Sequence, residues 1–290
     1  MSVDSENIIS SIAPAKINLF LHVTGKRPDN YHLINSIFAF SEFGDKIKIC
    51  ESQKDELLIT GEFSNQIEDS LDNLVFKTAD IIREQYNIEK PIKIHLEKNI
   101  PVGAGMGGGS SDAASTAKLL RKLWNLDIAD SELASLLLPI GADIPPCVHG
   151  KLSFISGIGE EIHSLALDNK LSILLVNPMI HITTADIFKM GIENYSTNIE
   201  ISDIPKTEKE LILWLQNKNN DLENNAIDLF PEVGNLINEI SNLDNCMLAR
   251  MSGSGSTCFG IFNNIDDAKN AANVIKDIYP DYWVVTSVFS

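Results

Sequence analysis

The segment from Pro101 to Asp112, PVGAGMGGGSSD, holds five glycines within seven positions and constrains this chain more than any other feature. Glycine carries no side chain, so such a segment can bring its main-chain N–H groups directly against a ligand. Alternating apolar residues at 92–96 predict a half-buried strand before it, and apolar residues with helical spacing at 113–124 predict a helix that begins near Ser111. Together these features predict an anion site suited to phosphates at the N-terminus of the helix.

Two better-known glycine loops are alternatives to this interpretation. Gly103, Gly105 and Gly108 match the spacing of the dinucleotide-binding fingerprint, with Asp127 at a suitable distance, so a dehydrogenase stays open as an alternative. Pro101, however, interrupts the strand where a dinucleotide-binding fold runs straight into its turn. No Gly-Lys-Ser/Thr is present, which excludes a Walker loop. We therefore expect a phosphate-binding loop of another kind, and a thermal shift with ATP rather than NAD would separate it from a dehydrogenase.

Strand and helix patterns mix along the whole chain without the strict alternation of a doubly wound parallel sheet, which favours an α+β architecture. With 290 residues the chain is long enough for two domains, and glycines and Asp-Asn between 150 and 170 suggest a division into residues 1–160 and 161–290. Helices are predicted at 74–86 with Asp72 or Asn73 as cap, after the capping box Thr207 to Glu210, and at 268–278. Further strands are predicted at 46–50, 57–60, 171–176 and 283–289.

Composition limits the partners that we expect. The formal net charge of -17 disfavours nucleic acid and an anionic membrane as partners, although a local site for an anionic small molecule stays possible. Four scattered cysteines without a C-x-x-C pair are typical of reduced thiols in a cytoplasmic protein. No apolar run is long enough to span a bilayer, and the first residues carry no basic targeting segment. We expect a small-molecule substrate and a monomer or weak homodimer.

Four spaced segments resemble the GHMP kinases, the family named for galacto-, homoserine, mevalonate and phosphomevalonate kinases. The segment from Pro101 to Ala114 resembles the family's second motif, and residues 13–32 and 251–259 resemble its first and third motifs. With Gly141 to Pro145, the resemblance covers residues 13 to about 262 in the right order. It implies a two-domain α+β fold of mixed sheets with packed helices. Within the family, the chain is most similar to the branch that phosphorylates the 2-hydroxyl of a cytidine diphosphate methylerythritol in the non-mevalonate route to isoprenoids.

The resemblance implies a catalytic pair formed by Lys16 and Asp143. An aspartate can accept the hydroxyl proton or orient the nucleophile, and a lysine can neutralise charge on phosphoryl oxygens. Taken without the motifs, Lys16 would be interpreted as a surface lysine and Asp143 as a turn residue. Asn18 would share a strand face with Lys16 and hydrogen-bond near the substrate hydroxyl.

The resemblance also implies a pocket for the cytosine ring. Tyr31 and His32 match the pair that recognises the base, and Phe188 matches the aromatic residue that closes its other face. An aromatic sandwich suits a flat base. Thr184 aligns with a threonine that contacts the substrate. The alternative interpretation is structural, with Phe188 in the core and Tyr31 packed in a loop.

ATP with Mg²⁺ is the implied phosphate donor, and the residue that holds the metal stays open. Ser110 and Ser111 offer hydroxyls to a phosphate oxygen or to the metal ion. A second glycine turn, formed by Gly253, Ser254 and Gly255, is expected against the substrate phosphates. The implied ATP-binding residues are Asn73, Lys98, Pro101, Val102, Gly103, Ala104, Gly105, Met106, Gly107, Gly108, Gly109, Ser110 and Ser111.

The chain departs from the family pattern at a few positions. Asn30 stands where the family commonly has glycine, which asparagine tolerates if its φ is positive. Met106 replaces the usual leucine, and residues 144–147 replace a more aromatic stretch. None of these departures touches a proposed catalytic group. Two alternatives stay open: a family kinase with another acceptor, such as homoserine or another polyol, and a non-catalytic nucleotide-binding relative, against which the intact Lys16 and Asp143 count.

Overall fold

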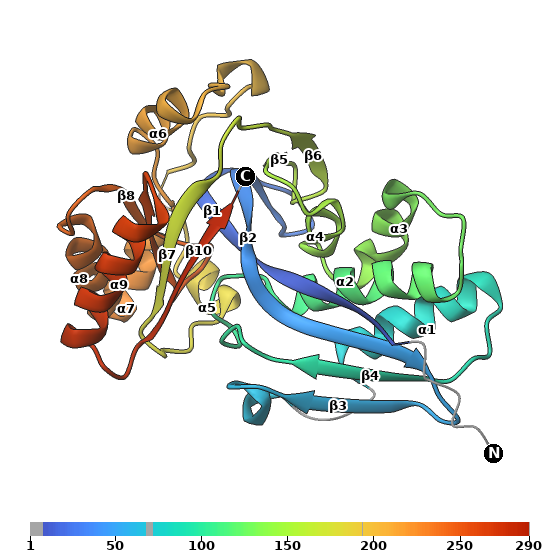
Figure 1. The fold of residues 1–290 in the computed structure, drawn as a ribbon. Helices are drawn as coiled ribbons and strands as arrows, with labels where there is room; N and C mark the ends of the chain where they lie inside the picture. The colour runs from blue at the N-terminus through green and yellow to red at the C-terminus, as the bar shows by residue number, and fades with distance from the viewer. Residues whose placement is uncertain (1–7, 68–71, 193, 290) are drawn as a thin grey trace. The chain divides into compact units, whose positions relative to one another are not determined.

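The computed structural model, drawn in Figure 1, describes residues 8–67, 72–192 and 194–289. The chain divides into two compact units whose segments alternate along the sequence. Unit 1 contains the residues up to 15 together with 44–102 and 108–150, and unit 2 contains 16–43, 103–107 and 151–290. This arrangement differs from the single division at residue 160 that the sequence suggests. The strands β1 (Ile9–Lys26) and β2 (His32–Glu51) each contribute residues to both units, so no single cut separates them.

The sheet of unit 1 has β4 (Ile92–Glu97) between two neighbours. β4 pairs antiparallel with the end of β2, with Lys46 opposite Glu97, and parallel with β3 (Glu56–Thr60). Ile92, Ile94 and Leu96 are fully buried, as the alternating pattern predicts.

Four helices complete unit 1, with α1 packed against α2 and α4 packed against both α2 and α3. They are α1 (Leu74–Tyr86), α2 (Gly108–Leu123), α3 (Asp130–Leu137) and α4 (Ile144–His149), with short 3-10 turns η1 (Ser64–Gln66) and η2 (Leu138–Ile140). α2 packs through small residues, since Ala113 and Ala117 are fully buried, and this lets neighbouring helices approach closely.

Unit 2 is built on an antiparallel sheet in the order β2, β10, β7, β9, β8. Its strands besides β2 are β7 (Leu171–Asn177), β8 (Cys246–Met251), β9 (Cys258–Phe262) and β10 (Trp283–Phe289). Every residue of β7 is buried, as its continuous apolar pattern predicts. A small hairpin of β5 (Ser153–Ser156) and β6 (Glu161–Ser164) pairs with residues 36–38 of β2.

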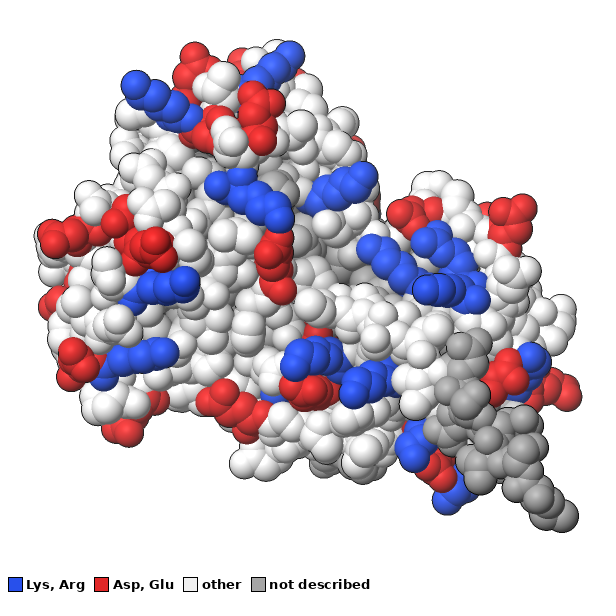
Figure 2. All heavy atoms as spheres, viewed as in Figure 1, with Lys and Arg blue, Asp and Glu red and all other residues white. Residues whose placement is uncertain are grey.

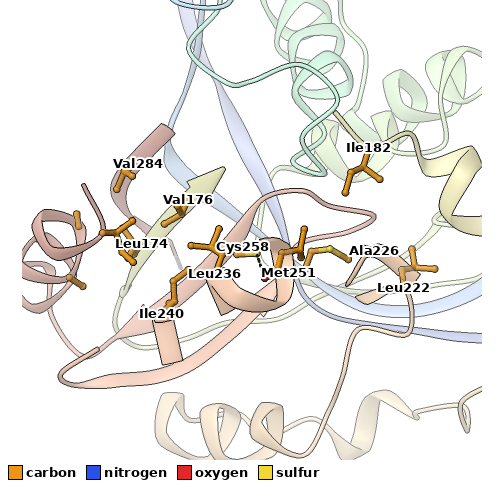
Figure 3. Packing of buried hydrophobic residues seen from close by; sticks show 14 of the residues in the cluster. Leu174, Val176, Ile182, Leu222, Ala226, Leu236, Ile240, Met251, Cys258 and Val284 are labelled. Atoms are coloured by element: carbon orange, nitrogen blue, oxygen red, sulfur yellow. Dashed lines mark hydrogen bonds between the residues drawn. The ribbon is translucent and has the colours of Figure 1, made fainter. Parts of the chain in front are cut away.

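The helices of unit 2 are α5 (Thr184–Lys189), α6 (Glu208–Gln216), α7 (Glu223–Leu229), α8 (Pro231–Ser241) and α9 (Ile265–Ile278), with the 3-10 turn η3 (Ile201–Asp203). Figure 1 shows α8 and α9 beside the strands β7 to β10, against which they pack. The buried side chains Val176, Leu236, Met251 and Cys258 come from a helix and three strands and meet in one apolar core, drawn in Figure 3. This core supports the end of β8 from which the second glycine turn begins.

Most of the predicted elements are confirmed, including the cap of α1, where Asn73 accepts a hydrogen bond from the amide of Val75 over 3.1 Å. α2, however, begins at Gly108, three residues before the predicted start at Ser111. Gly108 and Gly109 adopt helical backbone despite their low helix propensity, so the first turn of α2 carries no side chain on these two residues. No helix among the described residues is long and apolar enough to cross a membrane.

Charged side chains are interspersed on the face drawn in Figure 2, where acidic and basic groups lie among neutral ones. The net charge of -17 therefore does not gather into one acidic patch on that face.

Candidate functional site

The segment Gly103–Gly107 in unit 2 has a backbone that requires glycine. Gly103, Gly105 and Gly107 have φ values of 66°, 73° and 60°, in the left-handed region that side chains disfavour. A Cβ atom on Gly105 would lie 2.4 Å from the carbonyl oxygen of Ser252, and one on Gly107 would lie 3.0 Å from Cε of Lys16. These glycines therefore allow the segment to approach both the second glycine turn and Lys16.

The second glycine turn, residues 252–257, is hydrogen-bonded to this segment. The hydroxyl of Ser252 donates to the carbonyl oxygen of Gly105 over 3.0 Å and accepts from the amide of Asn18 over 3.1 Å. The amide of Thr257 donates to the carbonyl oxygen of Ala104 over 3.3 Å. Two motifs about 150 residues apart in sequence are thus joined to each other and to β1 within unit 2.

Lys16 and Asn18 lie side by side on β1. Nζ of Lys16 donates to Oδ1 of Asn18 over 3.0 Å and lies 4.3 Å from the ring centroid of Phe38. Nδ2 of Asn18 in turn donates to the hydroxyl of Ser36 over 3.0 Å. The main-chain amide of Lys16 donates to the carbonyl oxygen of Met106, so the lysine is also tied to the glycine segment. Lys16 is 4% exposed, so its side chain is almost fully buried.

Asp143 lies in unit 1, directly before α4. It follows Gly141, and its carbonyl oxygen accepts from the amide of Cys147 in the first turn of that short helix. The structure therefore brings Lys16 together with Asn18 and the glycine segment in one unit, and it holds Asp143 on the other.

The first turn of α2, in unit 1, continues the glycine segment. Ser111 is 1% exposed, and its hydroxyl oxygen has no hydrogen-bond partner among the described residues. A buried hydroxyl without a partner is costly, and a ligand atom at this position would satisfy it. The free amides of the helix N-terminus favour an anion at the same place.

Lys98 was expected near the nucleotide, and in unit 1 its ammonium group is held by two carboxylates. Nζ of Lys98 donates to Oδ2 of Asp112 over 2.7 Å and also to Asp45, and all three side chains are almost fully buried. Burial lowers the pKa of Lys98, but the two carboxylates outweigh it and the pKa is raised. Oδ1 of Asp45 accepts from the amides of Asn99 and Ile100, which fixes the chain at the entry to the glycine segment.

Asp112 carries the strongest electrostatic effect of this cluster. Burial raises its pKa to about 8, and the attraction of Lys98 only partly opposes this shift, while the neighbouring Asp45 adds to it. Oδ1 of Asp112 has no hydrogen-bond partner among the described residues.

The residues expected to bind cytosine meet in unit 2. The rings of His32 and Phe188 are stacked, with centroids 4.4 Å apart and planes inclined by 17°. This separation leaves no room for a third ring between them, so a base would stack on an outer face or separate the pair. Tyr31 is 56% exposed beside them in sequence, and burial together with the charge of Lys26 lowers the pKa of His32. The imidazole is therefore neutral near pH 7 and can both donate and accept hydrogen bonds.

Two further expected residues also lie together. Thr184 begins α5, and its hydroxyl is hydrogen-bonded to that of Ser254 over 2.8 Å. This contact links the helix of Phe188 to the second glycine turn. Asn30 has a φ of 72°, as its place in the glycine position of the family requires.

Sequence reasoning missed several residues that shape these arrangements. Asp112 and Ser252 lie within two of the motifs but were assigned no role, and Asp45 has no local pattern that marks it, although Asp112 is a charged residue among the buried residues of α2. That position could have signalled a buried ion pair. No group of three or more histidine, cysteine, aspartate and glutamate side chains suited to a metal ion occurs within the described residues.

Comparison with known proteins gives matches over most of the chain. Residues 73–151 match the model of the GHMP kinases N terminal domain, and residues 207–281 match that of the GHMP kinases C terminal domain. A protein of Chelativorans sp. (strain BNC1) named 4-diphosphocytidyl-2-C-methyl-D-erythritol kinase is 40% identical over 278 residues, which cover 95% of this chain and 94% of that protein. A protein of the same name from Agrobacterium fabrum (strain C58 / ATCC 33970) is also 40% identical, with 93% of each chain covered.

Solved structures agree with the sequence comparison. The crystal structure of a 4-(cytidine 5'-diphospho)-2C-methyl-D-erythritol kinase superposes with a TM-score of 0.79 at 27% identity and covers 97% of this chain and 100% of that one. A homoserine kinase from Cytophaga hutchinsonii superposes with a TM-score of 0.71 at 16% identity, covering 100% of this chain and 96% of its own, which shows a shared fold.

Proposed function

The chain belongs to the GHMP kinases, and on this basis we propose that it transfers the γ-phosphate of ATP to the 2-hydroxyl of 4-diphosphocytidyl-2-C-methyl-D-erythritol. The reaction is a step in the formation of isoprenoid precursors by the non-mevalonate route. The observation that best supports this proposal is the conformation of the glycine segment, whose left-handed glycines pack against Lys16 and the second glycine turn. Two relatives that carry this activity in their names are matched over 94% and 93% of their lengths, and they support the choice of acceptor.

The phosphates of ATP bind the main-chain amides of the segment from Pro101 to Ser111. A Cβ atom on Gly107 would lie 3.0 Å from Cε of Lys16, so glycine at this position lets the segment lie close to the lysine that acts on the phosphates. The amides at the start of α2 add the positive end of the helix. Asn73 caps α1, which packs against α2, and thereby supports the helix that carries these amides.

Lys98 acts on the nucleotide site through the two side chains that bind its ammonium group, Asp45 and Asp112. Asp112 lies in the first turns of α2, which follow the glycine segment, and Asp45 accepts from the amides of Asn99 and Ile100, which precede it. The cluster therefore fixes the chain before and after the segment, in unit 1. Lys98 thus serves ATP binding by holding this segment.

The residues present also fit a magnesium ion. The buried hydroxyl of Ser111 has no partner among the described residues, and with Ser110 it would hold the metal beside the phosphates. The metal would supply charge neutralisation for the phosphoryl oxygens.

Lys16 and Asp143 perform the transfer. Lys16, fixed by Asn18 and Phe38, stabilises negative charge on the phosphoryl group, and Asn18 hydrogen-bonds the region of the acceptor hydroxyl. Asp143 accepts the proton of the 2-hydroxyl or orients its oxygen for in-line attack.

The acceptor is recognised by its base and by its diphosphate. Tyr31, His32 and Phe188 provide aromatic faces for cytosine, and the neutral imidazole of His32 can bond to the edge of the base. Gly253, Ser254 and Gly255 face the diphosphate, with Thr184 hydrogen-bonded to Ser254. The enzyme acts in the cytoplasm as a monomer or weak homodimer on small molecules, without nucleic acid or membrane partners.

The test is a coupled assay of ADP release with four acceptors at equal concentration. We expect release with 4-diphosphocytidyl-2-C-methyl-D-erythritol and none above background with mevalonate, homoserine or galactose. Release with homoserine or another polyol alone would replace the proposed acceptor and keep the family activity. No release with any acceptor, combined with measured ATP binding, would favour a non-catalytic relative.

A further inference from the structure

Asn220 lies between α6 and α7 and reaches the second glycine turn. Its side chain is 4% exposed, and Nδ2 donates to the carbonyl oxygens of Met251 over 3.0 Å and of Gly253 over 2.7 Å. Oδ1 accepts from the amide of Leu222 over 3.0 Å. Both N–H groups and the oxygen of this amide are therefore used, and two carbonyl acceptors fix which end of the amide faces the turn.

The main chain around Asn220 is anchored on β1. The amide of Leu21 donates to the carbonyl oxygen of Asn219 over 3.1 Å, and the amide of Asp221 donates to the carbonyl oxygen of Leu21 over 2.8 Å. β1 also carries Lys16 and Asn18. Asn220 thus connects the strand of the proposed catalytic lysine to the turn through one buried side chain.

Neighbouring side chains of the same segment make different contacts. Oδ2 of Asp221 accepts from the amide of Val23 over 2.7 Å, and Oε2 of Glu223 accepts from the amide of Met251 over 2.9 Å. These bonds hold β1 and the end of β8, before the turn begins. Among residues 219–223, the contact with Gly253 comes from Asn220.

The two glycines of the turn have a left-handed backbone, and one of them lies against the glycine segment. Gly253 has a φ of 57° and Gly255 one of 89°, and a Cβ atom on Gly253 would lie 3.0 Å from the carbonyl oxygen of Gly105. The position of this carbonyl-rich turn therefore affects the position of the glycine segment directly, because the two backbones are in contact.

We propose that Asn220 is a positioning residue that sets the second glycine turn against β1, and through it the segment Gly103–Gly107. By clamping the carbonyl of Gly253 it aims the amides of Gly253 and Ser254 at the diphosphate of the acceptor. This inference rests on the proposed function for the identity of that ligand, while the clamp itself is a property of the chain alone.

Two variants test the clamp. Asn220→Ala removes both donors, and Asn220→Asp keeps the shape and the acceptor for Leu222 but places an oxygen against two carbonyl oxygens. Leu236→Ala and Ile240→Val, in the core shown in Figure 3, serve as controls that lower stability without touching the turn. Steady-state kinetics give kcat and the KM for each substrate, and hydrogen–deuterium exchange without ligands follows the amides of Gly255 and Thr257.

We expect both Asn220 variants to lower kcat/KM for the acceptor by about tenfold or more, the size of one lost hydrogen bond, with a smaller change in the KM for ATP. Exchange at Gly255 and Thr257, whose amides bond to Ser252 and Ala104, should rise by a similar factor. The controls should show neither change at matched thermal stability.

Two results would overturn the clamp: exchange at the turn equal to that of the controls, or kinetic losses no larger than theirs. Inactivity of the unmodified chain toward the cytidylated acceptor would instead refute the proposed function. The exchange measurement would still decide the inference, because it needs no substrate.

Discussion

Nζ of Lys16 lies 3.0 Å from Oδ1 of Asn18, two residues further along β1 on the same strand face. A buried ammonium held by an amide oxygen and the ring of Phe38 keeps its direction, and it makes a preorganised charge of the kind that stabilises transition states. The bond follows from the spacing of the two residues, because a strand period of two places their side chains side by side.

Replacing Lys16 by methionine keeps the apolar stem and removes the charge. We expect the single-turnover rate to fall by about 10²–10³, as for loss of one transition-state donor, with ATP affinity changed much less. Lys48→Met, which removes an exposed lysine of β2, is the matched control and should keep the normal rate. Equal rates in the two variants would show that Lys16 has no role in transfer.

Gly105 and Gly109 should respond in opposite ways to alanine. At Gly105 the backbone is left-handed and the new Cβ atom would meet the carbonyl oxygen of Ser252, so we expect a loss of about 1–3 kcal/mol in the free energy of unfolding. At Gly109, in the first turn of α2, the nearest atom is Cδ1 of Leu74 at 3.5 Å, and alanine favours the helix. Urea unfolding of both variants measures the difference, and similar losses would contradict the packing described.

Phe188→Ala should weaken the acceptor's binding through its base. Loss of stacking is expected to cost about 1–3 kcal/mol in the binding of a cytidine nucleotide, while ATP affinity stays the same. Tyr282→Ala removes a ring from another stacked pair, with Tyr279, and should leave both affinities intact. Calorimetry with CDP decides the question, and undiminished binding to the Phe188 variant would remove this residue from the pocket.

The buried carboxyl of Asp112 predicts a pH dependence of stability. Its folded pKa of about 8 lies above its usual value of 3.8, so between these values the folded chain keeps a proton that the unfolded chain has lost. The free energy of unfolding should therefore fall as pH rises through this window, by up to about 1.4 kcal/mol per pH unit, and level off above pH 8. Asp112→Asn should remove this slope in urea titrations at pH 5, 7 and 9. Parallel profiles for the two proteins would contradict the assignment.

Local patterns predicted the elements that carry the site. The strand at 92–96, the helix at 74–86 with Asp72 or Asn73 as its cap, and the glycine segment all follow from neighbours in sequence, and the structure selects Asn73 as the cap. The start of α2 was predicted too late, because two glycines have low intrinsic helix propensity and only the packed structure makes them helical.

Contacts between distant residues could not be predicted in the same way. Lys98 meets Asp45 across 53 positions, and Asn220 meets Gly253 across 33, and no periodic pattern encodes such pairs. The alternation of the two units along the sequence could not be predicted for the same reason. β1 and β2 are long enough to contribute residues to both units, and this becomes visible only when their pairing partners are known.

The central claim is that the chain moves the γ-phosphate of ATP onto the 2-hydroxyl of 4-diphosphocytidyl-2-C-methyl-D-erythritol. Phosphorus NMR of the chain mixed with ATP, Mg²⁺ and this acceptor follows every phosphorus atom at once. We predict one new phosphomonoester signal that grows in step with ADP while the diphosphate of the acceptor persists, and growth slower by about 10²–10⁴ with the Asp143→Asn variant. Accumulation of ADP without a new phosphomonoester, or an unchanged rate in that variant, would contradict the account.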